Sequence, residues 1–589
     1  MIWLTTSIAL LLGLSLYYVF VRKPSIHRHG QPLRQAFHSI PSKLPLHAPD
    51  SLPLLGNAIQ FLKPRHVLFD WFVKCQHIFG HETFEISVPS LPPGVVINSP
   101  QVLEYVLKNE AAITKGEFFR ERSWDLFGYG IINASGELWR AQRKAGLKFF
   151  SGTNLDIMID DVLPEIYQDS TMNVLSQAAQ DRSVVDLQRI FHDLTTTVVG
   201  HMAYDMEIEA SSPFSKAFDH ASSQIGLRFQ NPLYRLTEIF TGSSFRAALV
   251  EVKRFGRQIV SEARKRRARE AFESLITNTH EEETTLKKQR EQPDNDDDEF
   301  GLGFGSLIDS LIESLGDPKI VADAALNFLS AGRDTTAQSF TWTFYALLRH
   351  PEALKRVREE IDSKFQVKPA PTVEKKSLDA AAVASAESED EDVEIDVSAL
   401  QPSSLPYTMA AFYESLRLYP PVPFEIKQTT QPVTLPDGTS LPAGAVVVWC
   451  IWALNRSSST FGEDAHSFRP ERWLETDTSK PNSNSDADTN TAPEQHTLKF
   501  TGSKYSAGEF PVFNGGPRSC LGKKMAELMG AWVLVRMLYE WDFEEVNDGL
   551  NMDSLSGQRR SANSLTLPME GGLPVRVTRR KRRSGGGVK

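Results

Sequence analysis

Cysteine is scarce in this sequence. Only Cys75, Cys450 and Cys520 occur among its 589 residues. Three cysteines do not make a disulfide framework, and so low a number suits a reducing compartment. The chain also has no C-x-x-C pair and no H-E-x-x-H motif, which argues against the common zinc sites. Each cysteine therefore has to be interpreted from its own surroundings.

Positive charge is also in deficit. Lys and Arg number 64 against 74 Asp and Glu, which gives a formal net charge of -10 at neutral pH. This acidic balance argues against nucleic acid as a partner. The sequence has no evident internal repeat and no G-x-G-x-x-G dinucleotide fingerprint. Its length and its 41% hydrophobic content still allow a large buried core.

Charge is absent altogether from Ile2 to Val21, and most of these residues are apolar. A helix of about twenty apolar residues spans the core of a bilayer. Arg22, Lys23 and Arg28 follow at once, and basic residues after a span favour the cytosolic side. The sequence predicts a single-pass transmembrane anchor over residues 1–21. A cleaved signal peptide is the alternative, but a basic start and an obvious cleavage site are missing.

Composition divides the rest of the chain. Residues 22–50 are rich in proline and are predicted to be an extended linker. Residues 51–578 form the predicted folded domain, and residues 579–589 a basic tail that could contact acidic lipid headgroups. Three polar, charged stretches bury too little apolar surface to order themselves and are predicted to be disordered inserts: 281–300, 366–400 and 475–498.

Hydrophobic periodicity predicts a mainly helical body with small antiparallel sheets. Helical patterns cover four long stretches: 137–150, 154–180, 245–275 and 304–348. The last stretch is expected to be broken or offset near Asp317-Pro318. The segment from Thr434 to Cys450 is typical of two strands joined by an Asp-Gly turn.

Cys520 lies in the segment FNGGPRSCLGKKMAE, a loop that leads into a helical run. A cysteine just before a helix sits beside partly positive N–H groups, which lower its pKa and favour the thiolate. Gly515 and Gly522 leave room for a flat group against the backbone, and Arg518 offers a cation for a carboxylate. A buried, inert cysteine is the plain alternative. A phosphate cradle fails because the glycine spacing is wrong and no Ser or Thr follows the lysines.

Three further motifs mean little when each is taken alone. Ala331-Gly332-Arg333-Asp334-Thr335-Thr336 lies in the longest helix, where it weakens helical pairing and predicts a local distortion. Glu414 and Arg417 are three residues apart and can pair on one helix face, as on any exposed helix. Trp139 and Arg143 belong to a basic helix, for which a solvated face is the ordinary interpretation.

Together these segments resemble, in their order along the chain, the cytochrome P-450 superfamily over roughly residues 50–578. The haem loop F-x-x-G-x-R-x-C-x-G of that family is matched by Phe513, Gly516, Arg518, Cys520 and Gly522. The resemblance implies the cytochrome P-450 fold and haem b (iron protoporphyrin IX), with Cys520 as the ligand of the iron. Four other residues would contact the haem: Phe513, Arg518, Trp139 and Arg143.

The resemblance also implies roles for the remaining motifs. Thr335 would hold a hydrogen bond to bound dioxygen, and Asp334 would help to pass protons to it. Glu414 and Arg417 would form a buried structural pair, which Arg472 would complete from a later loop.

The implied reaction is that of a monooxygenase, which inserts one atom of dioxygen into a C–H bond and releases the other as water. No room for a fused reductase follows residue 578, so the electrons are expected from NADPH through a separate reductase. The predicted anchor then places the protein in the endoplasmic reticulum membrane. A cationic patch could bind an acidic redox partner: Arg140, Arg143, Lys144, Lys523 and Lys524.

Some segments resemble the fatty-acid and alkane ω-hydroxylase branch in particular. They are DLFGYGI with GELWRAQRK, LRFQNPLYRL, and TLPDG with GEDAHSFRPERWL. The expected substrate is therefore lipophilic, a long-chain fatty acid or alkane hydroxylated at or near its terminal carbon. Pockets are mostly apolar, and five residues are candidates for the lining by their position: Phe119, Phe127, Ile131, Val422 and Phe424.

Other functions stay open at this point. A monooxygenase of a specialised metabolite or sterol would use the same chemistry with a different pocket. A haem-thiolate isomerase or dehydratase would not need proton delivery to dioxygen, so the presence of Asp334 and Thr335 argues against it. A purely structural membrane protein would explain the anchor but none of the ordered motifs.

Overall fold

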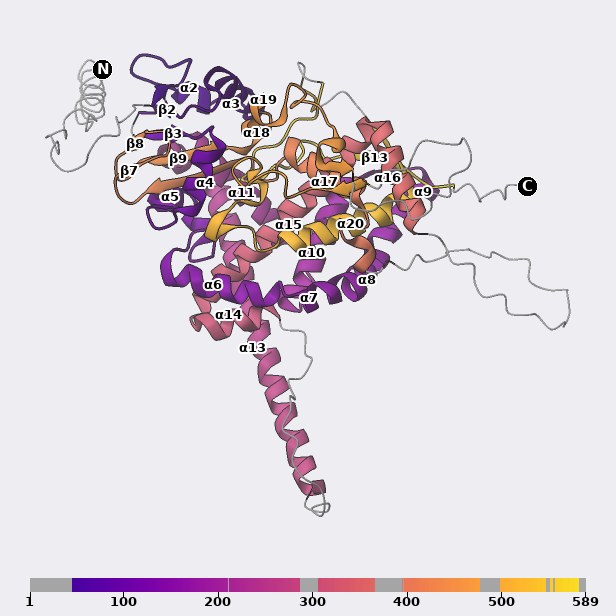
Figure 1. The fold of residues 1–589 in the computed structure, drawn as a ribbon. Helices are drawn as coiled ribbons and strands as arrows, with labels where there is room; N and C mark the ends of the chain where they lie inside the picture. Colours follow the sequence, from indigo (N-terminus) through magenta and orange to yellow (C-terminus); the bar gives the residue numbers. More distant parts are fainter. Residues whose placement is uncertain are drawn as a thin grey trace, which may run out of the picture.

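The computed structural model describes residues 45–89, 91–209, 211–285, 306–365, 395, 397–476, 498–546, 551–553 and 557–581. Its body is mainly helical, and the largest sheet lies at one side (Figure 1). The predicted helical fold class with small sheets is confirmed. Over the described ranges, no helix is both long and apolar enough to cross a bilayer. The anchor predicted for residues 1–21 lies outside them.

Helix α15, Pro318–Arg349, runs through the centre of the body (Figure 1). Pro318 suits its first turn because a proline has no N–H to satisfy. The Asp317 side chain accepts hydrogen bonds from the next two backbone N–H groups, at 2.7 and 3.3 Å, and so caps the helix. The preceding helix α14, Leu307–Leu315, ends just before this cap. The break predicted near Asp317-Pro318 is therefore confirmed.

Several helices surround α15 and share one large apolar core with it. Those packed directly on it include α10 (Leu187–Tyr204), α13 (Ser243–Thr285), α14 and α17 (Pro406–Leu418). The others that matter for the site are α3 (Arg65–Phe79), α4 (Pro100–Lys108), α5 (Gly116–Phe127), α6 (Gly136–Phe149), α11 (Pro213–Gln230), α12 (Tyr234–Thr241), α16 (Pro351–Lys364) and α20 (Lys523–Glu540). The stretch Gly152–Asp181 is helical as predicted, with two π-helical segments.

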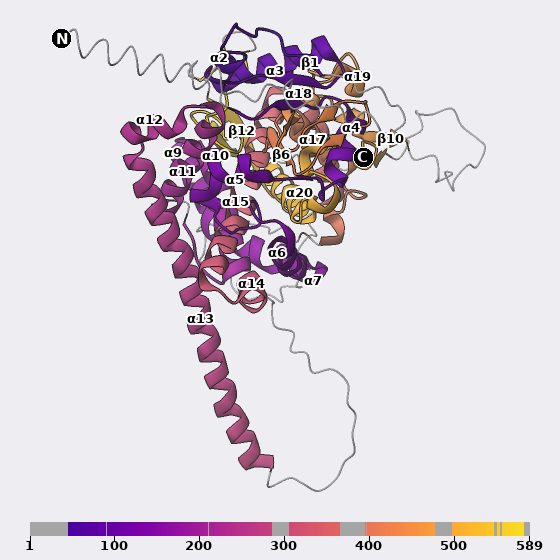
Figure 2. The ribbon, with the colours of Figure 1, turned by 90° about the vertical axis from the view of Figure 1, so that its left-hand side faces the viewer.

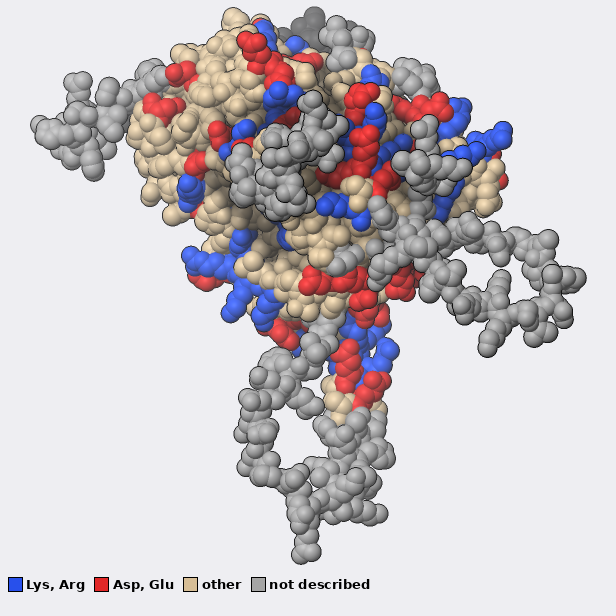
Figure 3. All heavy atoms as spheres, turned by 45° about the vertical axis from the view of Figure 1, so that its right-hand side comes forward, with Lys and Arg blue, Asp and Glu red and all other residues tan. Residues whose placement is uncertain are grey.

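Helix α13 extends well beyond the body (Figure 2). Acidic and basic side chains mix along its projecting part (Figure 3), and ion pairs such as Lys265–Glu262 at 3.0 Å support it. The helix continues to Thr285 and so includes the first residues of the stretch predicted to be an insert from 281.

The largest sheet has six strands in the order β1-β2-β3-β9-β6-β4. The strands are β1 (Leu46–His47), β2 (Phe84–Ile86), β3 (Gly94–Val96), β9 (Val446–Cys450), β6 (Phe424–Thr429) and β4 (Ile113–Thr114). Two of its pairs, β1–β2 and β3–β9, are parallel, so this sheet is mixed and differs from the small antiparallel sheets that were predicted. The predicted hairpin is confirmed: β7 (Val433–Thr434) pairs with β8 (Ser440–Leu441) around Gly438, whose φ is +85°.

Ordered structure extends further than composition suggested. Strand β1 lies inside the predicted linker and pairs with β2. A short helix, Val397–Leu400, lies at the end of the insert predicted for 366–400, and strands β10 (Leu474–Thr476) and β11 (Leu498–Phe500) pair at the two ends of the insert predicted for 475–498. Strand β13, Pro574–Arg579, takes the first residue of the predicted basic tail. Backbone pairing holds these short strands, and each of them contributes at least one apolar side chain.

Candidate functional site

The loop that carries Cys520 is closed by hydrogen bonds. The Cys520 backbone N–H donates to the carbonyl of Phe513 at 2.8 Å. From α6, the Arg143 guanidinium donates to the carbonyl and the hydroxyl of Ser519 at 3.0 and 3.2 Å. Arg143 therefore fixes Ser519, the residue next to the cysteine. The sequence did not reveal this contact. The side chain of Lys523 lies 5.3 Å from the centre of the Phe513 ring.

Two glycines of this loop are required by α4. At Gly516, where φ is +60°, a Cβ would come within 2.3 Å of the carbonyl oxygen of Leu107. At Gly515 a Cβ would lie 3.0 Å from the Leu107 side chain. The Cβ of Ala507 would be nearer still, at 2.8 Å, so the packing of the chain itself calls for glycine at this position. A Cβ at Gly522 would meet only ordinary contacts, the nearest in Phe150 at 3.7 Å.

Two residues, one in this loop and one in α15, are accessible to solvent. Solvent reaches the side chains of Cys520 and Ala331, although α15 is almost entirely buried on both sides of Ala331. A Cβ at Gly146 of α6 would lie 3.0 Å from both Leu521 and Phe328. The loop, α6 and α15 therefore meet beside the accessible stretch. An accessible thiol and a small, accessible residue of the central helix are what a flat macrocycle at this place would need.

The protein's own groups raise the pKa of the Cys520 thiol. Burial among protein atoms is the main cause, although solvent still reaches the side chain. The Gly522 N–H and the nearby Arg143 favour the thiolate, but they do not outweigh the loss of solvation. The sequence predicted a lowered pKa for Cys520. That prediction was wrong for the effect of the protein groups by themselves. The start of the helix supplies one N–H group to the sulfur. A positive metal ion would have to supply the remaining stabilisation of the thiolate.

Arg518 lies in a buried cluster with an acid that sequence reasoning missed. Its Nε donates to Glu110 at 2.6 Å, and its Nη2 donates to the Ala134 carbonyl at 2.9 Å. The guanidinium lies 4.9 Å from the centre of the Trp139 ring. The second oxygen of Glu110 accepts from Lys427 at 2.9 Å. The fold thus gathers the predicted Arg518 and Trp139 at one place, together with a carboxylate far away in the sequence.

The predicted distortion around residues 331–336 was wrong, because α15 continues through it as an α-helix. The Thr335 hydroxyl donates to the Ala331 carbonyl one turn earlier, at 2.6 Å, and this bond does not interrupt the helix. This hydroxyl still has lone pairs that can accept a hydrogen bond from a ligand. Thr335 is half-buried and borders the accessible stretch around Ala331.

Asp334 points into a different set of partners. The buried Arg333 donates to Asp334 at 2.8 Å and, with the same nitrogen, to Asp219 of α11 at 2.7 Å. The Nε of Arg333 donates to Thr196 of α10 at 3.0 Å. Asp219 is 56% exposed, so this chain of charged groups connects Asp334 with solvent. Burial raises the pKa of the Asp334 carboxyl, and Arg333 opposes the rise.

Glu414 is the centre of a second buried network, behind the loop. Arg417 donates to both of its oxygens at 2.7 and 2.8 Å, and Arg472 donates to it at 2.8 Å. Trp473 and the backbone N–H of Arg469 each donate at 2.9 Å. The predicted completion of the Glu414–Arg417 pair by Arg472 agrees with this geometry.

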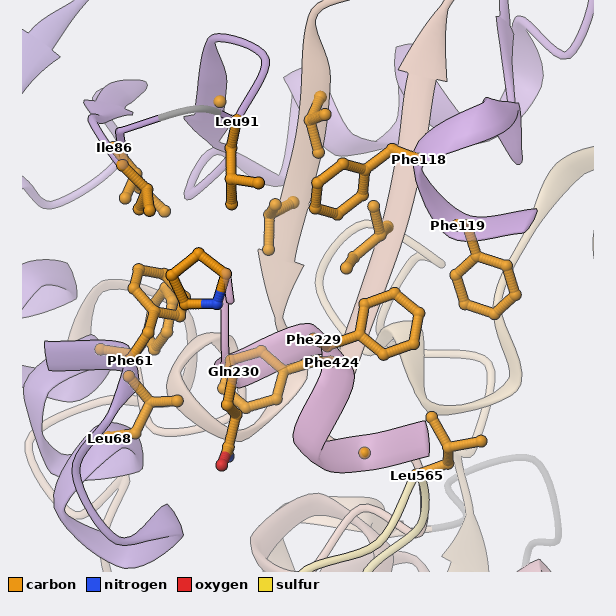
Figure 4. Close-up of a pocket in the computed structure, with 18 of the residues that line it drawn as sticks. Phe61, Leu68, Ile86, Leu91, Phe118, Phe119, Phe229, Gln230, Phe424 and Leu565 are labelled. Atoms are coloured by element: carbon orange, nitrogen blue, oxygen red, sulfur yellow. The ribbon is translucent and has the colours of Figure 1, made fainter. Parts of the chain in front are cut away.

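A separate apolar pocket lies between the large sheet, α3, α5 and α11. Figure 4 shows Phe118, Phe119, Phe229 and Phe424 turned toward a common space with Leu68. Of the five residues proposed from the sequence, Phe119 and Phe424 line this pocket. Phe127, Ile131 and Val422 are not part of that lining; Phe127 is buried in the main core and Ile131 packs against it.

Comparison with known proteins agrees with the geometry of the loop and of α15. The family model described as cytochrome P450 matches residues 46–567. Cytochrome P450 94A1 of Vicia sativa is 27% identical over 545 residues, which cover 90% of each chain. Cytochrome P450 monooxygenase cyp1 of Mycosarcoma maydis is 27% identical over 548 residues, 91% of this chain and 76% of that protein. Cytochrome P450 704B1 of Arabidopsis thaliana is 29% identical over 494 residues, 82% of this chain and 86% of that protein.

The chain therefore belongs to the cytochrome P450 family. It is an oxidoreductase, a monooxygenase of that family, and the family implies a haem, a redox partner and dioxygen. The residues present fit a haem: the Cys520 thiol is accessible, Arg143 is bonded to the neighbouring Ser519, and Arg143 and Arg518 both lie against Trp139.

Proposed function

We propose that this protein is a haem-thiolate monooxygenase that hydroxylates a long-chain fatty acid or alkane at or near its terminal carbon. Haem b would be held through Cys520, and electrons would come from NADPH through a separate reductase. The observation that carries the choice of substrate is the pocket of Figure 4, whose lining is almost wholly aliphatic and aromatic. An acyl or alkyl chain is the ligand that such a lining solvates best. The resemblance of several segments to ω-hydroxylases supports the same choice.

When bound, the haem supplies the activation of dioxygen, which a thiolate ligand favours. The chain's own residues would bind and orient. Arg143 holds the backbone of Ser519 and with it the position of the Cys520 thiol. Asp334 would take up and release protons, while Arg333 stays charged and orients its carboxylate, and Thr335 would offer its hydroxyl oxygen as a hydrogen-bond acceptor at the accessible face of α15. Apolar side chains keep bulk water away from the chain to be oxidised.

Membrane lipid is the proposed source of the substrate, and the endoplasmic reticulum membrane the proposed location. Exposed apolar side chains gather next to two residues that line the pocket, Phe61 and Pro232. They are Leu54, Leu55, Ile59 and Leu62 on one side, and Leu233, Leu236, Ile239 and Phe240 on the other. Two apolar surfaces of this kind are typical of a protein that touches a bilayer.

The reductase is proposed to dock where α6 and the start of α20 meet. Arg140, Lys144, Lys523 and Lys524 are exposed there, and a Cβ at Gly522 would contact Phe150, just after α6. Arg143 does not belong to this surface, because it is turned toward Ser519. Exposed lysines and arginines attract an acidic partner.

A product assay tests the proposed function. Purified full-length protein, haem-loaded and supplied with NADPH, dioxygen and a reductase, is expected to convert dodecanoic acid mainly to the 12-hydroxy and 11-hydroxy acids. Chromatography with mass spectrometry identifies the position of the new hydroxyl group. Turnover of sterols without any conversion of fatty acids or alkanes between 12 and 18 carbons would contradict the proposal and favour the alternative monooxygenase.

A further inference from the structure

The apolar pocket contains one cation. Among the described residues that line it, Arg65 alone carries a charge, and Gln230, Asn563 and Ser564 are the polar neighbours. Arg65 is the first residue of α3, and its side chain belongs to the same lining as Leu68, one turn later on the helix. A charge in a pocket built for hydrocarbon calls for a physical reason, because burial of a charge is costly.

Arg65 has no carboxylate partner in the described part of the chain. Only 7% of its surface is exposed. One nitrogen donates to the carbonyl of Ala562 at 2.9 Å, and the guanidinium lies 5.2 Å from the centre of the Phe69 ring. Burial lowers the pKa of Arg65 to about 9, with a smaller opposing contribution from Cys450. A guanidinium has five N–H donors, so a bidentate anion would find donors left.

Lys115 is a second cation close to this pocket, and its surroundings can be compared with those of Arg65. Its ammonium lies 4.3 Å from the centre of the ring of Phe119, which lines the pocket. Unlike Arg65, it has an acid of its own: Lys115 donates to Glu425 at 2.7 Å. The backbone around Arg65 adds to the contrast. Residue Pro64 precedes the helix and no side chain caps its first turn, where backbone N–H groups favour an anion.

We propose that Arg65 binds the carboxylate of a fatty-acid substrate. This inference rests on the proposed function and narrows its substrate class from acyl chains and alkanes to free acids. The carboxylate would supply the acidic partner that Arg65 lacks among the described residues, and Gln230 is a further polar group of the same lining. The hydrocarbon would lie among the phenylalanines, so that the end remote from the carboxylate is the end offered for oxidation.

Binding of matched ligands to the full-length holoenzyme tests the proposal. The probes are dodecanoic acid and dodecan-1-ol, which share one chain and differ in charge, and the dissociation constant is read from the shift of the haem absorption on binding. Wild type is expected to bind the acid more tightly than the alcohol. Arg65→Met is expected to weaken acid binding about 10- to 100-fold, the range of a hydrogen-bonded charge, and to leave alcohol binding unchanged within about twofold. Arg65→Lys is expected to restore part of the affinity for the acid.

Lys74→Met is the matched control, because it removes one positive charge from the exposed face of the same helix. It is expected to leave both constants unchanged. Equal weakening of acid and alcohol by Arg65→Met, or a wild type with no preference for the acid, would overturn the role of Arg65 while leaving the monooxygenase proposal intact. If wild type binds neither ligand and oxidises neither, the acyl-chain function fails and the role of Arg65 with it. The comparison of acid and alcohol binding by wild type does not depend on whether any variant folds.

Discussion

Replacing Glu414 by glutamine is expected to lower the free energy of unfolding by about 3–5 kcal/mol, the usual cost of breaking a buried ion pair from one side. Glu414 and Arg417 are fully buried and Arg472 is nearly so. The neutral amide would leave two guanidinium groups without a counter-charge, and it would meet their donors with an NH2 group in place of one oxygen. Denaturant unfolding followed by circular dichroism measures the loss.

A matched control shows whether the loss of stability is specific to the buried network or follows from removing any acid that pairs with an arginine. Glu117→Gln breaks the exposed pair with Arg120, where the carboxylate is 80% exposed. That change is expected to cost less than about 1 kcal/mol, as surface pairs do. Equal, small losses in both variants would mean that the Glu414 network contributes little to the stability of the fold.

The same network predicts how stability depends on pH. Burial opposes ionisation of Glu414, but Arg417 and Arg472 outweigh it, so the pKa of Glu414 is below its usual value. A carboxylate with a lowered pKa stabilises the folded state at pH values above its unfolded pKa, and this contribution disappears as the pH falls through the folded value. The difference in stability between wild type and Glu414→Gln is therefore expected to be full at neutral pH and to shrink in acid.

Asp334→Asn is expected to reduce the rate of product formation by about 100-fold or more, within the range that a positioned proton donor contributes. An asparagine keeps the size and the hydrogen bond from Arg333 but cannot exchange a proton. Arg333 would then face one carboxylate, that of Asp219, and one neutral amide. Rates of product formation and of NADPH consumption are measured together, and a larger solvent isotope effect is expected in the variant.

Asp323→Asn is the control on the same helix. Asp323 is also buried and accepts a hydrogen bond from a cation, Lys253, at 2.6 Å, but its other contacts are structural ones with the turn after α5. Per folded, haem-loaded molecule, this variant is expected to keep most of the wild-type rate. If Asp334→Asn turns over as fast as Asp323→Asn, with the same coupling of NADPH to product, Asp334 does not deliver protons.

The sequence predicted those parts of the site that depend on short motifs. The loop of Cys520, the central helix and the Glu414–Arg417 pair could all be located, because capping, turn glycines and i,i+3 spacing act over a few residues. The partners that complete the site could not. Glu110 reaches Arg518 across 408 positions of sequence and Asp219 reaches Arg333 across 114, and nothing local marks either acid.

Two errors had a common physical origin. Burial among protein atoms raises the pKa of the Cys520 thiol. The regular helix at Thr335 belongs to α15, which is packed on several sides by other helices. Both features depend on tertiary packing that the local sequence does not show. Arg65 was overlooked for the opposite reason: its sequence neighbours are ordinary, and it stands out only because the fold encloses it among apolar side chains.

Ligation of the haem iron by Cys520 is the central claim, and one spectrum tests it most directly. Full-length protein is reduced, treated with carbon monoxide and compared with a Cys520→Ser variant, with haem content measured separately in both. Wild type is expected to show a strongly red-shifted Soret band that the variant lacks. Wild-type protein that is folded and haem-loaded but shows no such band would contradict the claim, because Cys520 would then not be the ligand.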